Sequence, residues 1–149
     1  MSVIKENKNI KAITQKIIAL KHQLQEEGKK AIDASFKEFF EQYPEVKSLS
    51  WTQYTPYFND GDACYFSYND LIWHPCILEI DGEEVEYQEP GDEDCEWWET
   101  IRGQAAYGDI EELGNLLSSL EDSLKGIFGD HAKVVATKDG FEIEEYYHD

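Results

Sequence analysis

Apolar residues recur at helical spacing in the N-terminal part of the chain. Five of them follow one another at steps of three and four residues, the spacing of one helix face: Ile10, Ile13, Ile17, Leu20 and Leu24. A similar pattern resumes after Gly28 and stops near Pro44, which disfavours helix in the residue before it. Two interpretations stay open. Either one helix of about 35 residues forms an arm or coiled-coil strand about 50 Å long, or two helices meet near Gly28 and fold together.

The middle of the chain has the composition of β-strands. Aromatic and β-branched residues dominate from Ser48 to Phe58, and Asn-Asp-Gly-Asp at 59–62 is a strong turn signal. His74-Pro75 interrupts a later apolar run and indicates an edge or a bulge, because proline cannot donate to a strand ladder. Asp81-Gly82 predicts the next turn. In chain order the expected strands are 48–58, 63–68, 72–80 and 83–88, with a polar loop at 90–94.

A second amphipathic helix is expected from Asp109 to Phe128. Asp109 is a suitable N-cap, and Gly129 stands where a C-terminal cap glycine belongs. The apolar stripe of this helix consists of Ile110, Leu113, Leu116, Leu117, Leu120, Leu124 and Ile127. Beyond it, a last hairpin is expected, with strands at 133–136 and 141–147 and a turn at Lys138-Asp139-Gly140.

Together these elements predict an α+β fold. We expect a mostly antiparallel sheet of about five or six strands, an N-terminal segment of one long or two shorter helices, and one amphipathic helix near 109–128. The length of 149 residues fits a single domain, 1–149. Within it, 1–46 is expected to form a helical arm or helix pair and 47–149 an acidic α+β body.

The charged residues are unevenly distributed between the expected N-terminal helical segment and the rest of the chain. The formal net charge is -19, but residues 1–47 hold nine Lys/Arg and seven Asp/Glu, whereas residues 48–149 hold four and 25. Between Lys47 and Arg102 lie 54 residues without a lysine or arginine, and 14 of them are acidic. From Asp81 to Glu99 ten of nineteen positions carry a carboxylate. Such a body repels polyanions, so we expect neither direct nucleic-acid binding nor membrane binding.

The number of cysteines and the composition of the N-terminal residues bear on the cellular compartment in which we expect the protein. Cys64, Cys76 and Cys95 make an odd number of thiols, the first 30 residues contain no apolar signal-peptide core, and no stretch is apolar enough to cross a bilayer. The simplest expectation is reduced thiols and a cytoplasmic location.

One segment resembles a known pattern. Residues Trp51 to Asp62 read W-T-Q-Y-T-P-Y-F-N-D-G-D and resemble a W-x-Q-Y-T-P-x-F-N-D-G-D segment of small acidic proteins from bacteria and tailed phages. Phe36-Lys37-Glu38-Phe39-Phe40 and Pro44-Glu45 are similar to the part of the pattern that precedes it. The resemblance implies a bacterial or phage origin and an intracellular setting. That family has no assigned activity, so the resemblance supplies no catalytic residues.

Metal chemistry and catalysis find weak support in the sequence. Cys64, His74, Cys76 and Cys95 could make a Cys3His zinc site, but only His74 and Cys76 stand at short spacing. The acidic pairs at 60/62 and 92/94 could hold Ca²⁺ or Mg²⁺ but do not fit the twelve-residue calcium loop. No nucleophile motif or phosphate-binding loop is present. We therefore expect no catalytic residues, metal or cofactor, and keep a metal-dependent enzyme as an alternative.

The aromatic cluster between Trp51 and Trp73 is expected to be mainly sheet core, because stacking on nucleic-acid bases also requires a basic groove. Beside it, the acidic run suits a basic partner protein. The residues predicted to bind that partner are Glu83, Glu84, Glu86, Glu89, Asp92, Glu93, Asp94, Glu96, Trp97 and Trp98. The expected function is a non-catalytic acidic protein-binding module, in its most specific form a nucleic-acid-mimicking inhibitor of a nucleic-acid-binding or defence protein. Self-association through the N-terminal helices, with a solubilising acidic body, is the structural alternative.

Overall fold

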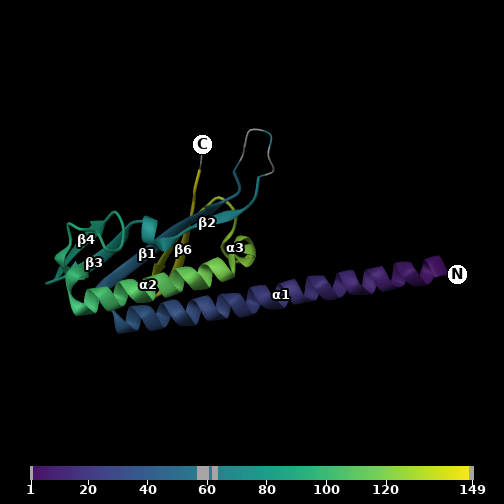
Figure 1. Ribbon diagram of the computed structural model, residues 1–149, viewed down its shortest axis with the longest axis horizontal. Helices are drawn as coiled ribbons and strands as arrows, with labels where there is room; N and C mark the ends of the chain where they lie inside the picture. Colours follow the sequence, from purple (N-terminus) through teal and green to yellow (C-terminus); the bar gives the residue numbers. More distant parts are fainter. Residues whose placement is uncertain (1, 57–60, 62–63, 148–149) are drawn as a thin grey trace.

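A single uninterrupted helix forms the N-terminal segment. In the computed structural model, which describes residues 2–56, 61 and 64–147, α1 runs from Ser2 to Gln42. Of the two interpretations of this segment, one long helix is therefore correct. Its end is where the sequence predicts it, since Tyr43 N still donates to Phe39 O (2.9 Å) and Pro44 follows. Figure 1 shows the N-terminal half of α1 extending well beyond the rest of the chain.

The sheet is antiparallel throughout, which confirms the predicted fold class. Its strands follow the order β4-β3-β1-β5-β6, and β2 pairs with β1 off this path. The strand bounds are β1 Val46–Tyr54, β2 Ser67–Asn69, β3 Cys76–Ile80, β4 Glu83–Tyr87, β5 Ala132–Thr137 and β6 Gly140–Glu145. The predicted last hairpin and the hairpin about Asp81-Gly82 are confirmed as β5–β6 and β3–β4. Both form where alternating patterns flank a glycine-containing turn.

Alternate residues of the central strand β1 face the helices. Trp51 is fully buried, and its ring lies 5.8 Å from that of Phe36 in α1 and 5.4 Å from that of Phe128. Gln53, on the same face, is also fully buried. Ser50 points to the opposite face, where its Oγ donates to the Pro75 carbonyl (2.9 Å). The core therefore lies between this face of the sheet and the helices, as the period of two along a strand requires.

The predicted helix 109–128 is wrong in its start and in its continuity. The structure has two helices there, α2 Ile101–Ser119 and α3 Glu121–Phe128. Thr100 is the true N-cap, with its Oγ1 accepting from Gly103 N–H (3.0 Å). Asp109 instead lies within α2, where it accepts a hydrogen bond from Tyr43 Oη (2.8 Å). The start was missed because the first turns of α2 are rich in glycine and alanine, which show little apolar periodicity.

Two strand predictions also need correction. The expected strand 72–80 is a 3₁₀ turn, η1 Leu71–Trp73, followed by β3. Asp70 caps this turn by accepting from Ile72 N–H (3.3 Å), so the chain bends before Pro75 and does not extend through it. The returning strand expected at 63–68 is only the short β2, which does pair with β1 as predicted. The turn predicted at 59–62 falls largely outside the described residues.

A short 3₁₀ turn, η2 Glu96–Glu99, leads from the polar loop into α2. No helix among the described residues is both long enough and apolar enough to cross a membrane.

Candidate functional site

The acidic run wraps around one end of the molecule and does not form a single flat face. It begins in the turn before β4, the edge strand beside β3, continues through β4 and the loop 88–95 and ends in η2 (Figure 1). Neighbouring residues of an edge strand point to opposite faces of the sheet. Val85 pairs with the buried Leu78 on the helix side, whereas Glu84 pairs with Glu79 on the other side. The ten predicted binding residues are therefore divided among different surfaces.

One group of four surrounds a pocket of about 480 Å³, here called the acidic–aromatic pocket. Its walls come from η1, the loop 88–95, η2 and the first turns of α2. The lining residues are Ile72, Trp73, Glu89, Pro90, Gly91, Asp92, Glu93, Cys95, Trp98, Glu99, Gln104 and Tyr107. The pocket brings together four of the ten predicted binding residues: Glu89, Asp92, Glu93 and Trp98.

Ring packing fixes one wall of this pocket. Trp98 is 6% exposed, and its ring meets Trp97 at 4.9 Å and Tyr107 at 6.4 Å, both nearly edge-on. Within the described part of the chain its Nε1 has no hydrogen-bond partner, so packing and not hydrogen bonding holds the indole. Trp98 is thus part of the pocket wall, not a side chain free to insert into a partner.

The loop is folded onto α2 by a glycine and an aspartate. Gly91 has a φ of +81°, and a Cβ there would lie 3.0 Å from the Tyr107 ring, so only glycine fits both the turn and the contact. Asp92 Oδ1 accepts from Asp94 N–H (2.9 Å), which stiffens the next turn. The two half-buried carboxylates of the loop, Glu89 and Asp92, are consequently held at the pocket.

The electrostatic character of the pocket is uniformly negative. Four carboxylates line it, those of Glu89, Asp92, Glu93 and Glu99, and none of its described lining residues is a Lys, Arg or His. Burial raises the pKa of the Tyr107 hydroxyl, and the nearby charges of Glu111 and Glu89 raise it further. The tyrosine therefore stays neutral, and every ionised group at the pocket is an acid.

The remaining predicted residues lie on two other surfaces. Glu83, Asp94, Glu96 and Trp97 line a shallow depression of about 510 Å³ on the helix side of β4. Glu86 lines a small groove of about 120 Å³ on the other face of the sheet, beside Ser50 and Lys133. Glu84 is exposed on that same face. The half-buried Trp97 lies between the depression beside β4 and the acidic–aromatic pocket, because its ring packs on Trp98.

Three of the lining residues that the sequence did not indicate carry an aromatic ring or a charge: Trp73, Tyr107 and Glu99. Trp73 belongs to the aromatic cluster that was expected to be core, but it is 70% exposed. The cluster is mixed in general, since Trp51 is fully buried and Tyr65 is 76% exposed, while Tyr57 and Phe58 fall outside the described residues. The signal that could have placed Trp73 outside the core is Asp70, a turn-capping residue three positions earlier.

Two residues of the candidate Cys3His zinc set, His74 and Cys76, are engaged in other ways. His74 Nδ1 lies 2.9 Å from the Asp70 carbonyl and Nε2 lies 3.1 Å from Thr52 Oγ1. Because a carbonyl can only accept, Nδ1 carries the proton and Nε2 accepts from the threonine hydroxyl. Cys76 is fully buried, and burial, reinforced by Cys95 and nearby acids, raises its pKa to about 12. No three His, Cys, Asp or Glu side chains among the described residues are grouped to hold a metal ion.

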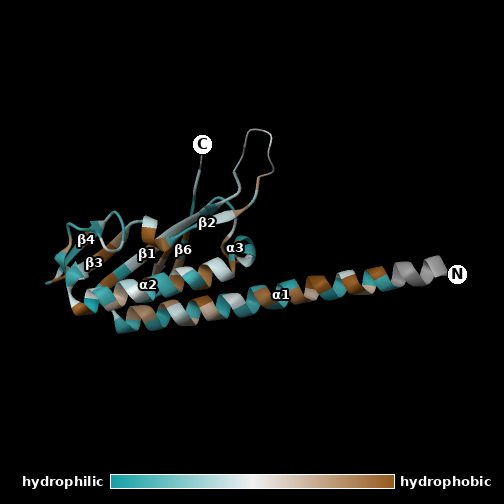
Figure 2. Ribbon diagram, viewed as in Figure 1, coloured by the Kyte–Doolittle hydropathy of each residue, from teal (hydrophilic) through white to brown (hydrophobic). Residues whose placement is uncertain are grey.

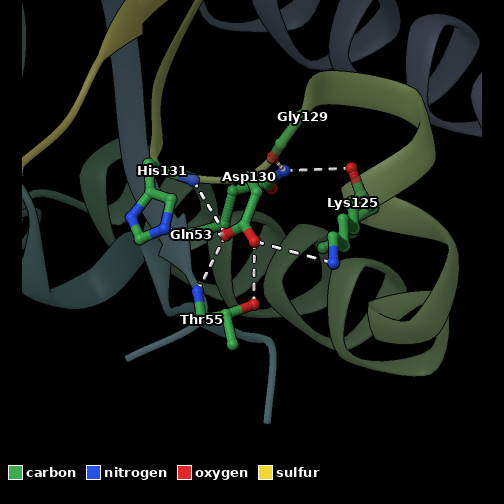
Figure 3. A network of polar contacts seen from close by, with 7 residues as sticks. Gln53, Thr55, Lys125, Gly129, Asp130 and His131 are labelled. Carbon is green, nitrogen blue, oxygen red and sulfur yellow. Dashed lines mark hydrogen bonds and ion pairs between the residues drawn. The ribbon is translucent and has the colours of Figure 1, made fainter. Parts of the chain in front are cut away.

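A second polar cluster, around Asp130, serves the fold. Asp130 Oδ1 accepts from Thr55 N–H (2.8 Å) and from His131 N–H (2.9 Å), and Oδ2 accepts from Thr55 Oγ1 (2.9 Å) (Figure 3). In the same place Gln53 Nε2 donates to the Leu124 and Gly129 carbonyls (2.9 and 2.6 Å), which caps the end of α3. These contacts fasten the end of β1 to the turn between α3 and β5.

Comparison with known proteins adds no family to this description. A scan against protein-family models, a search of curated proteins and a search of solved structures each gave no match. The resemblance of residues 51–62 to small acidic bacterial and phage proteins therefore stays a prediction.

Proposed function

We propose that this protein is a non-catalytic binding module that accepts a lysine or arginine side chain of a basic partner protein in the acidic–aromatic pocket. The observation that carries the proposal is the composition of that pocket, in which exposed Trp73, buried Trp98 and Tyr107 are accompanied by four carboxylates. Aromatic faces attract cations through the ring quadrupole, and carboxylates attract them through charge.

Partial burial of the carboxylates favours this function over a solubilising role. Charges on an open surface are strongly screened by salt, whereas half-buried charges such as Glu89 and Asp92 are screened less. Keeping several acids together without an internal cation is unfavourable for the fold. A cationic partner would relieve that repulsion, and solubility alone does not require the acids to converge on an aromatic pocket.

Guanidinium is the best match to the pocket chemistry. Arginine stacks on aromatic rings and forms paired hydrogen bonds with carboxylates, and it loses less hydration than a lysine ammonium. The pocket volume of about 480 Å³ accommodates one long side chain with its flanking backbone. We therefore expect arginine-containing segments to bind more tightly than lysine-containing ones.

Imitation of nucleic acid is the more specific form of this proposal. In that form the partner uses the same basic surface for nucleic acid, and duplex DNA competes with this protein for the partner. A partner that binds both at once, with unchanged affinities, would contradict the mimicry and leave the pocket proposal intact.

A matched pair of triple variants tests the pocket. The pocket variant is Trp73→Ala/Glu89→Gln/Asp92→Asn. The control, Tyr65→Ala/Glu142→Gln/Glu144→Gln, removes the same number of charges and one exposed aromatic ring elsewhere, with the glutamates in the opposite edge strand β6. The probe is a fluorescent nine-residue peptide of alternating arginine and glycine, titrated at low salt.

We expect the pocket variant to weaken peptide binding at least about tenfold and the control to change it less than about threefold. Equal weakening by both variants would mean that only net charge attracts the peptide. No weakening by the pocket variant would place the binding elsewhere. Circular dichroism and urea unfolding confirm that both variants are folded.

A further inference from the structure

Residues 9–24 of α1 present an exposed apolar stripe. Every side chain from Asn9 to Leu24 is exposed, and from Asn9 onward the first buried residue of the helix is Gly28. Figure 2 shows apolar residues repeated along this projecting segment. The large apolar side chains, each 47–61% exposed, are Ile10, Ile13, Ile17, Ile18, Leu20 and Leu24. We call residues 9–24 the arm.

The arm has the repeat of a coiled coil. Ile10, Ile17 and Leu24 occupy position a of successive heptads, and Ile13 and Leu20 occupy position d. The body uses a different set of residues, including Ile32 and Phe36, which are buried against the sheet and other helices. An exposed helix of this length is marginal by itself, and an unbroken apolar stripe marks an interaction surface.

We propose that the arms of two copies of this chain pair as an antiparallel, two-stranded coiled coil. With Ile17 packed against Leu20 of the partner subunit, Ile13 packs against Leu24 of the partner subunit. The two-fold symmetry repeats both layers. Each of these four layers joins an isoleucine to a leucine. The proposal rests on the arm alone and is independent of the acidic–aromatic pocket.

Charge decides the orientation. In a parallel pair, Lys16 at position g would face Lys21 at position e of the partner subunit, which is unfavourable. In the antiparallel register, Lys16 lies near Gln23 of the partner subunit and Lys21 near Thr14 of the partner subunit. Parallel pairing would also bring the two acidic bodies side by side, whereas antiparallel pairing places them at opposite ends of the coil.

The oligomeric state of the full chain tests the pairing. We expect sedimentation equilibrium to give twice the chain mass of 17.3 kDa for the natural sequence. The seam variant Ile17→Lys/Leu20→Lys should be a monomer with unchanged urea unfolding of the body. The control Ala12→Lys/Ala19→Lys adds the same charge on the opposite side of the arm and should remain dimeric. A monomeric natural protein at 100 µM, or a dimeric seam variant, would overturn the proposal.

The orientation has its own measurement. Spin labels at Asn9→Cys, in a Cys64→Ser background in which the other two thiols are buried, report the distance between the arm tips. In the antiparallel register Asn9 lies beside Gly28 of the partner subunit, so the labels are about 28 Å apart along the axis. A distance near 10 Å would show parallel pairing. A third outcome is that the full chain forms assemblies larger than a dimer and that the pocket variant abolishes them. In that case the arms dock on the acidic bodies of other copies, which would also overturn the proposal.

Discussion

The ionised state of Asp130 is stabilised by the hydrogen bonds that its carboxylate accepts. Its side chain is 24% exposed, and burial by itself would raise its pKa. The hydrogen bonds from Thr55 and His131 outweigh burial and hold the pKa of Asp130 below its ordinary value. The ionised form is therefore favoured in the folded protein, so this residue contributes stability that is present above the pKa of the unfolded chain and is lost as the pH falls through the lower folded pKa.

Asp130→Asn should accordingly destabilise the protein most at neutral pH. We expect the free energy of unfolding in urea to fall by about 1–3 kcal/mol at pH 7, and the difference from the natural protein to shrink as the pH approaches 3. Asp139→Asn, in the exposed turn before β6, is the control for the charge change and should have little effect. A constant difference from pH 7 to pH 3 would contradict this role of the ionised carboxylate.

For single residues, the sequence shows how many carboxylates a segment carries but not on which surface each of them lies. The density of carboxylates between Asp81 and Glu99 is visible without any structure. Which of them share a pocket depends on the contact of Gly91 with Tyr107, residues that belong to a loop and to a helix. No local pattern encodes that contact, because neither periodicity nor turn chemistry links the two positions. The exposure of Trp73 is likewise hidden by the aromatic-rich segment around it, and only the turn-capping Asp70 hints at it.

At the scale of elements, Gly28 marks the place where α1 becomes buried against the body. Its missing side chain lets α1 approach α3 and the turn before it, since a Cβ would lie 3.3 Å from Leu120 and 3.8 Å from Ile127. The sequence marked Gly28 as a possible break between two helices. In the structure the helix is continuous, and the glycine serves close packing.

Gly28→Val should therefore separate the two elements locally. We expect the free energy of unfolding to fall by about 1–3 kcal/mol, the usual effect of added volume at a packed contact. The same substitution at Gly108, an exposed helical glycine with open space around it, should change the value by less than about 0.5 kcal/mol. Urea unfolding of both variants measures the contrast, and equal effects would show that Gly28 has no packing role.

Elements with a strong local signal were predictable, and those that depend on contacts were not. The β3–β4 and β5–β6 hairpins combine alternating patterns with glycine turns, and both formed as expected. The first turns of α2 carry small residues such as Gly103 and Ala106, which are buried. Burial of small residues is a tertiary property, so the helix start was placed too late along the chain.

At the scale of the whole molecule, charge and apolar surface are separated. The arm contains Lys11, Lys16 and Lys21 and no acid, whereas residues 48–149 carry 25 of the 32 Asp/Glu. The acidic end lies far from the arm tip (Figure 1). In the account proposed here the arm joins two copies, and the acidic–aromatic pocket of each body faces outward to a basic partner. A dimer with two pockets would bind a partner that has repeated basic segments more tightly than a single pocket does.

The tryptophan indole signals offer the most direct test of the pocket. In a two-dimensional ¹H–¹⁵N spectrum the four indole N–H groups give separate signals, and single Trp→Phe variants assign them. On addition of the arginine–glycine peptide, we expect the largest shifts at Trp73 and Trp98 and no shift at Trp51, which is fully buried between the sheet and the helices. Saturating peptide binding that leaves the Trp73 and Trp98 signals unshifted would contradict the proposal that this pocket receives the cationic side chain.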